Sequence, residues 1–275
     1  MSYLEIPLPR LVMTLGLVVL AILASRWKRL DLERDLAWGA LRGAVQLLAI
    51  GHVLLLLFEH ERPEWVALAL SVMLGVAAAT SARRVEHGPS ARTLFPYALL
   101  AIVLGSVVAL APVFVFVVPL HPMYEARYLV PISGMMIASA MNVVALVFER
   151  IFAAAPAHAG EIEQLLALGA TPEQALARHV RASVRAAMIP TLNSLLTVGL
   201  VALPGMMTGQ IVSGTAPEQA VRYQIVILYQ LVAVAAVSGG LAGEFARRLL
   251  FTPRAQLRLP PRAPAIGVRR RRAPW

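Results

Sequence analysis

The sequence predicts an all-α protein, a polytopic membrane bundle of about seven transmembrane helices. Apolar residues make up 59% of the 275 residues and charged residues only 15%, whereas a soluble domain is usually about 45–50% apolar. The mean hydropathy is +0.71. The apolar residues form long runs, and the charged residues lie between these runs. Because the chain has no cysteine, disulfides, thiolate metal sites and cysteine nucleophiles are excluded.

Seven apolar runs are long enough to cross a bilayer, which takes about 20 residues per helix. In chain order, these predicted spans are residues 10–26, 36–58, 65–82, 95–118, 128–148, 188–212 and 220–243. The first run might be confused with a signal peptide, but it is followed by the dense positive charge of Arg26, Lys28 and Arg29. A cleaved signal peptide has its charge before the apolar run. We therefore expect the first run to be a retained span.

The distribution of basic residues predicts the orientation of these spans. Of the 25 Lys and Arg residues, 21 fall on one side of the predicted membrane and four on the other, namely Arg10, Arg62, Arg127 and Arg222. The positive-inside rule then places the N-terminus outside and the C-terminus in the cytoplasm. Because the charges lie beside apolar spans, the net charge of +10 indicates contact with lipid headgroups and no nucleic-acid partner.

The chain divides into a membrane domain and a short tail. Residues 1–251 hold the predicted spans and a long polar stretch, 149–187, that we expect in the cytoplasm. Residues 252–275 are rich in Pro and Arg and contain few apolar residues. We expect this tail to be disordered or to rest on anionic headgroups.

The sequence lacks the residues of several kinds of active site. Lys28 is the only lysine, so the chain has no G-x-x-x-x-G-K-[ST] loop for ATP phosphates. None of the fifteen Asp and Glu residues falls in the middle of a predicted span, where ion-coupled carriers usually need one. We expect no catalytic residue and no cofactor. An ion-coupled secondary transporter and a polytopic membrane enzyme are the alternatives to a transporter driven by another subunit.

The polar stretch contains a helix, a glycine stop and a second helix in residues 163–175. Gly169 follows the first helix. Thr171 can cap the second, Pro172 suits its first position, and Gln174 completes a capping box. A plain solvated connection between two spans would have the same pattern.

Several motifs carry a resemblance to known transport proteins. The run L-A-L-G-A-T-P, with Glu163 six residues before its glycine, resembles the EAA-type coupling loop of ABC importer permeases. Here Gln164 and Leu165 replace two alanines and the I-x-L-P ending is absent, so import is not implied. Four further motifs resemble the FetB-type (UPF0014) permeases, and they are G-M-M-I-A-S-A-M-N (134–142), I-P-T-L-N-S (189–194), V-A-L-P-G-M-M-T-G-Q-I (201–211) and A-V-R-Y-Q-I-V-I (220–227).

This resemblance implies a function, partners and a location. FetB-type permeases are bacterial proteins linked to iron export and related to plant aluminium-tolerance ABC subunits. It implies a multi-pass permease of the bacterial inner membrane, assembled as a homodimer and driven by a separate ABC ATPase subunit. The cargo would be iron or another metal or small solute. The residues implied to couple to the ATPase are Glu163, Leu168, Gly169, Ala170, Thr171 and Pro172.

Polar and irregular positions inside the spans are candidates for the translocation pathway. In residues 203–210, one proline and two glycines weaken a membrane helix, and exposed backbone there is tolerated beside protein or a watery cavity. We therefore expect a broken helix beside a pathway here; a simple kink or an early helix end is the alternative. Methionine thioethers suit Cu(I) more than iron and also pack well in apolar cores, so we assign no metal ligands. The pathway candidates are Met135, Met136, Asn142, Asn193, Pro204, Gly205, Met206, Met207, Thr208 and Gln210.

Overall fold

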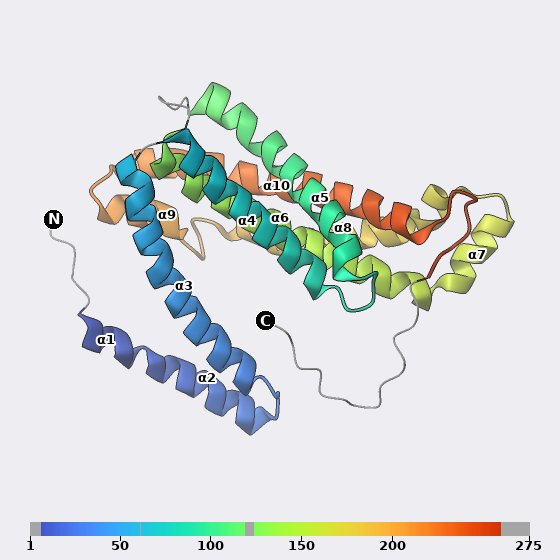
Figure 1. Ribbon diagram of the computed structural model, residues 1–275, viewed down its shortest axis with the longest axis horizontal. Coiled ribbons are helices and arrows are strands. Elements are labelled where there is room, and N and C mark those ends of the chain that lie inside the picture. The colour runs from blue at the N-terminus through green and yellow to red at the C-terminus, as the bar shows by residue number, and fades with distance from the viewer. Residues whose placement is uncertain (1–6, 61, 119–123, 260–275) are drawn as a thin grey trace.

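The computed structural model describes residues 7–60, 62–118 and 124–259, and over these residues it is nearly all helical. This confirms the predicted all-α class. The elements are α1 (Leu8–Met13), α2 (Leu15–Lys28), α3 (Glu33–His60), α4 (Pro63–Arg84), α5 (Ala91–Pro112), the π-helical turn η1 (Val113–Val117), α6 (Ala126–Ala157), α7 (Ala159–Ala167), α8 (Pro172–Thr197), α9 (Gly205–Val212) and α10 (Pro217–Leu250). Figure 1 shows α6 and α10 running roughly along the long axis, with α4 and α5 packed obliquely beside them.

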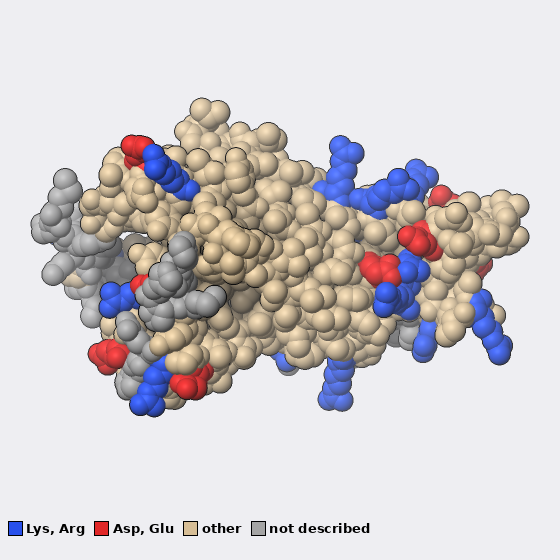
Figure 2. Space-filling view, turned by 90° about the horizontal axis from the view of Figure 1, so that it is seen from above, with Lys and Arg blue, Asp and Glu red and all other residues tan. Residues whose placement is uncertain are grey.

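Five of the helical segments are long and apolar enough to cross a membrane: α3, α4, α5 with η1, α6 and α10. Figure 2 shows the charged side chains gathered toward the two ends of the molecule, with an uncharged band between them. Both observations confirm a polytopic membrane bundle. The two remaining predicted spans do not correspond to single long helices, because the first is interrupted at Thr14 and residues 188–212 contain a break.

The break in residues 188–212 lies earlier than the sequence predicts. α8 ends at Thr197, residues 198–204 are irregular, and α9 then begins at Gly205. Gly199 has φ +80°, a conformation that ends a helix and that glycine adopts without strain. Pro204 is the N-cap of α9. A broken helix is therefore present, but the break lies at residues 198–204, and most of the predicted segment 203–210 is helical. Pro204 precedes α9 as a start signal and does not interrupt a helix.

The core lies where α5, α6 and α10 meet. Phe148 and Phe152 of α6 are fully buried there with Ile102 of α5. α5 and α10 approach closely, since a Cβ built on Gly105 would lie 1.9 Å from the Ser238 Oγ. Small residues allow such close approach between membrane helices.

The segment α1–α3 stands apart from this core, as Figure 1 shows. Only 6% of the apolar window of α3 is buried, against 56% for α6. The turn between α2 and α3 is held by Ser25, whose Oγ donates to the Glu33 Oε1 at 3.1 Å and accepts from the Leu32 N–H at 3.2 Å. The hairpin is thus locally well formed but makes little contact with the bundle.

The first part of the tail turns back on the bundle. Phe251 pairs with Leu257, the Thr252 N–H donates to the Gln256 carbonyl at 2.9 Å, and Leu257 and Leu259 pack against the core. This short turn differs from the unpacked chain that we expect for the tail. The rest of that prediction, for residues 260–275, lies outside the described residues.

Candidate coupling surface and pathway residues

The hairpin α7–α8 projects at one end of the molecule (Figure 1). Its turn begins with two backbone hydrogen bonds, from the Ala170 N–H to the Leu165 carbonyl and from the Gly169 N–H to the Leu166 carbonyl, both at 3.0 Å. This is the Schellman pattern of helix ends, which places a glycine in the left-handed region. Gly169 has φ +88°, so the predicted glycine stop is confirmed.

The start of α8 is a complete capping box. The Gln174 N–H donates to the Thr171 Oγ1 at 3.2 Å, and the Thr171 N–H donates to the Gln174 Oε1 at 2.9 Å. Pro172 occupies the first helical turn. Each bond satisfies a backbone N–H donor that has no acceptor within the helix. The predicted helix, glycine stop and second helix are therefore all present.

The hairpin is anchored on one face and exposed on the other. Ile162 of α7 and Leu176 of α8 are fully buried in the core cluster. Leu168, at the turn, is 85% exposed, an unusual position for a large apolar side chain. Of the other predicted coupling residues, Glu163, Gly169 and Thr171 are exposed, and Ala170 and Pro172 are half-buried. Leu168, Gly169, Ala170, Thr171 and Pro172 thus lie together on one firmly attached turn with an apolar tip, and Glu163 lies earlier, within α7.

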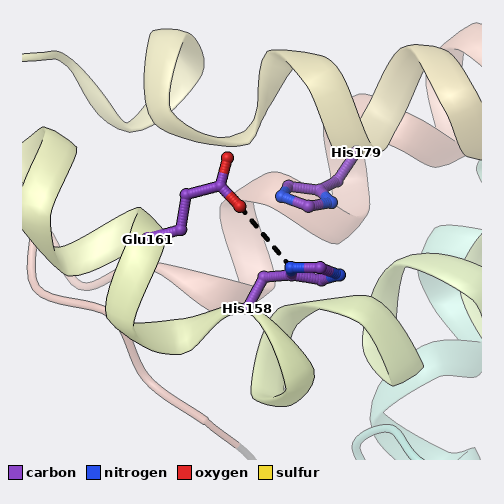
Figure 3. Close-up of side chains that lie close together, drawn as sticks. All are labelled: His158, Glu161 and His179. Carbon is purple, nitrogen blue, oxygen red and sulfur yellow. Dashed lines mark ion pairs between the residues drawn. The ribbon is translucent and has the colours of Figure 1, made fainter.

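A second group of side chains lies at the base of the hairpin, and sequence reasoning missed it. Figure 3 shows His158, at the α6–α7 junction, Glu161 of α7 and His179 of α8 pointing toward one another. The His158 Nδ1 lies 3.5 Å from the Glu161 Oε2, and the two imidazole centroids are 4.7 Å apart. The i, i+3 spacing of the first two was visible in the sequence. The third joins them only because α8 packs back on α7.

Burial and charge keep His179 in its neutral form. Burial lowers the pKa of His179, and the nearby His158 and Arg178 lower this pKa further, while Glu161 acts in the opposite direction. A neutral imidazole has a free nitrogen lone pair, the form that binds a metal ion.

The predicted pathway methionines pack as ordinary apolar side chains. Met136 is fully buried and Met207 is buried, and Met135 and Met206 pack against the same core cluster. Methionine commonly fills gaps in apolar cores because its side chain is flexible and polarizable. Their packing gives no sign of a thioether metal site.

The polar pathway candidates are not gathered in one place. The Asn142 Oδ1 accepts from the Arg84 Nη1 at 3.2 Å, at the C-terminal end of α4. Asn193 is exposed on α8. The Thr208 Oγ1 donates to the Gly205 carbonyl at 2.9 Å within α9.

α9 and α10 carry buried amide oxygens without partners. The Oε1 atoms of Gln210 on α9 and of Gln224 and Gln230 on α10 have no hydrogen-bond partner among the described residues. Buried polar atoms are nearly always satisfied by protein or ordered water. The Gln230 Nε2 donates to the Ala109 carbonyl of α5 at 3.5 Å, so these amides do not all lie on one face of α10. α9 packs mainly against α10, and the unpaired Gln210 Oε1 marks α9 as a place where water is expected.

The fold and its exposed surfaces define the class of this protein. Long apolar helices, charged ends and an exposed hairpin at one end belong to a polytopic integral membrane protein. Residues 8–251 match a family described as "Uncharacterised protein family (UPF0014)". The chain belongs to this family, which confirms the resemblance noted in its motifs.

Relatives in bacteria cover nearly the whole chain. The chain is 35% identical over 247 residues to the "Probable iron export permease protein FetB" of Escherichia coli (strain K12), covering 90% of this chain and 93% of that protein. It is 36% identical over 260 residues to the "UPF0014 membrane protein YjkA" of Bacillus subtilis (strain 168), covering 94% and 99%. The "UPF0014 membrane protein slr1647" of Synechocystis is 38% identical over 215 residues, covering 78% and 82%. No solved structure matches the chain.

Proposed function

We propose that this chain is the membrane-spanning permease subunit of an ABC transporter in the bacterial inner membrane, driven by a separate ATPase. The observation that carries the proposal is the α7–α8 turn. It exposes Leu168 at its tip while Ile162 and Leu176 fix it to the bundle. An apolar side chain on a rigid turn suits a protein pocket, because little conformational entropy is lost when it binds.

The cargo and the direction of transport are proposed from the relatives. One relative is named a probable iron export permease, and we propose export of iron or of another metal or small solute. The chain itself has no P-loop sequence for ATP, which supports a separate energy-supplying subunit. The name of this relative also supports a transporter over an enzyme.

We propose seven spans, with the N-terminus outside. α1 and α2 together cover residues 8–28, long enough to cross at about 1.5 Å per residue. α8 and α9 would form the sixth span, crossing through the break at residues 198–204. Ile189, Leu196 and Leu200 are exposed and apolar along this segment, as lipid contact requires. The alternation of helix directions in Figure 1 agrees with this order.

We also propose that two copies form the transporter, with α3 at their interface. Its sparse burial of 6% leaves most of an apolar helix uncovered in the single chain, although its C-terminal part packs near Val66 and Val130. A cross-link between copies carrying Leu47→Cys supports this arrangement, because Leu47 is exposed on α3. A wholly monomeric cross-linking pattern along α3 contradicts it and leaves lipid as its neighbour.

The test of ATPase docking changes the tip of the hairpin. Leu168→Ser should abolish co-purification with a stand-alone nucleotide-binding subunit from the same genome, because the apolar contact is removed. The protein should remain inserted at normal abundance, since Leu168 contributes no burial to the bundle. The matched control is Leu30→Ser, because Leu30 is also exposed and lies on the same predicted side. Equal co-purification of the two variants would overturn the docking assignment.

A further inference from the structure

The geometry points to a binding site for a divalent transition-metal ion at the base of the α7–α8 hairpin, formed by His158, Glu161 and His179. One ligand atom from each lies within 4.8 Å of the others. The ligands come from the α6–α7 junction, α7 and α8. No other group of three or more such side chains occurs among the residues that the structure describes.

The donor set selects the kind of ion. Two imidazoles and one carboxylate suit borderline ions such as Zn²⁺ and Fe²⁺, while Mg²⁺ and Ca²⁺ prefer oxygen ligands alone. Ligands that share a tetrahedral Zn²⁺ at about 2.0–2.2 Å lie about 3.3–3.6 Å from one another. His158 and Glu161 are already 3.5 Å apart, so only His179 needs to move closer, by side-chain rotation.

The electrostatic surroundings partly favour and partly oppose a cation. Glu161 supplies a negative charge, which favours binding. Arg178 opposes it, since its Nη1 lies 3.5 Å from the Glu161 Oε1. The other oxygen of Glu161 faces His158 and remains available. Because the three groups are partly exposed, water can fill the open coordination positions.

Such an ion would fix the angle between α7 and α8, because it joins ligands on both. The turn of this hairpin carries the predicted coupling residues, so metal binding would change how the turn is presented to an ATPase. This second step rests on the proposed function. Metal binding itself does not, and it is measured on the permease alone.

The test uses Co²⁺, whose visible absorption reports its coordination. The full chain is purified in detergent through a tag without histidine and titrated with Co²⁺. The site is supported if each chain binds one Co²⁺ ion and the bound ion shows the visible absorption band of coordination by imidazole and carboxylate. Glu161→Gln and His179→Ala should each weaken binding by more than the roughly 10- to 100-fold loss typical of outer-shell changes. Glu161 is exposed, so Glu161→Gln keeps the test valid if His179→Ala fails to fold.

Two further variants complete the test. His87→Gln is the matched control, because His87 pairs with Glu149 at 2.8 Å but belongs to no group of three possible ligands among the described residues. The Co²⁺ affinity of this variant should equal that of the unchanged protein. Arg178→Gln should raise the affinity, since it removes a positive charge from the site. Unchanged affinity in Glu161→Gln and His179→Ala would overturn the site. Intact metal binding without ATPase docking would contradict the proposed function alone.

Discussion

At the scale of single residues, two glycines of the α7–α8 hairpin allow the effect of backbone strain to be tested without a difference in steric contact. Gly169 has a positive φ, and Gly160 of α7 does not. A Cβ added to either would meet no atom within 4 Å. The two positions therefore differ chiefly in backbone conformation.

We expect opposite effects from the same substitution at these two glycines. Gly169→Ala should destabilise the turn by about 1–2 kcal/mol, because an L-residue is strained in the left-handed region. Gly160→Ala should stabilise α7 by about 0.5–1 kcal/mol, since alanine favours helix. Hydrogen exchange of the Ala170 amide measures both. Equal exchange in the two variants would mean that the φ of Gly169 carries no strain.

The sequence predicted local residue geometry well and missed geometry formed by packing. Gly169 and the Thr171–Gln174 capping box depend on neighbours within a few positions, so their chemistry could be read directly. His179 belongs to a different helix from His158 and Glu161. Nothing in the spacing indicates that the α7–α8 turn brings these three side chains together.

At the scale of elements, the break between α8 and α9 shows how one motif has two structural meanings. Pro-Gly at residues 204–205 reads as a helix breaker inside a presumed span. In the structure, Pro204 precedes α9 and the chain is already irregular from residue 198. The composition identified the right region, but α8 already ends at Thr197, because Val198 is extended and Gly199 has a positive φ. Helix boundaries depend on the backbone conformation of single residues, which the apolar pattern does not predict.

We expect water at the face of α9 that meets α10. In the cysteine-free chain, Thr208→Cys and Gln210→Cys should react with a membrane-impermeant thiol reagent, because the buried Gln210 Oε1 lacks a protein partner. Substrate or ATP should change the rates. Leu70→Cys and Leu100→Cys are the controls, placed on apolar spans. Labelling that is equal at all four positions and independent of ligand would remove α9 from the pathway.

At the scale of the whole molecule, five helical segments among the described residues are spans by length and hydropathy. The two further spans that we propose are α1 with α2, near the N-terminus, and α8 with α9. The apolar pattern alone predicted the membrane class and the helices α3 to α6 and α10. It could not settle the others, because α2 is short and α8 is amphipathic and partly polar. Their assignment therefore depends on charge asymmetry in addition to hydropathy.

Topology measurements distinguish these arrangements. Reporter fusions after Arg84 and at residue 165 should read as cytoplasmic, and a fusion at Thr215, between α9 and α10, should read as external. The reason is the excess of basic residues, 21 against four, on the side that includes the hairpin. A cytoplasmic signal at Thr215 would mean that α8 and α9 do not cross, and an external signal at residue 165 would invert the molecule.

The unbroken first part of α8 gives the molecule a mechanical lever. From its capping box to Pro190, residues 172–190, the helix contains no glycine or internal proline, so it spans about 27 Å as a stiff rod. A rotation of about 5° at the capped end displaces the far end by roughly 2 Å. Pro190 lacks an amide hydrogen and is the first point where the rod can bend. Movement applied at the hairpin is therefore transmitted with little loss to Pro190, about two turns before the irregular segment at residue 198.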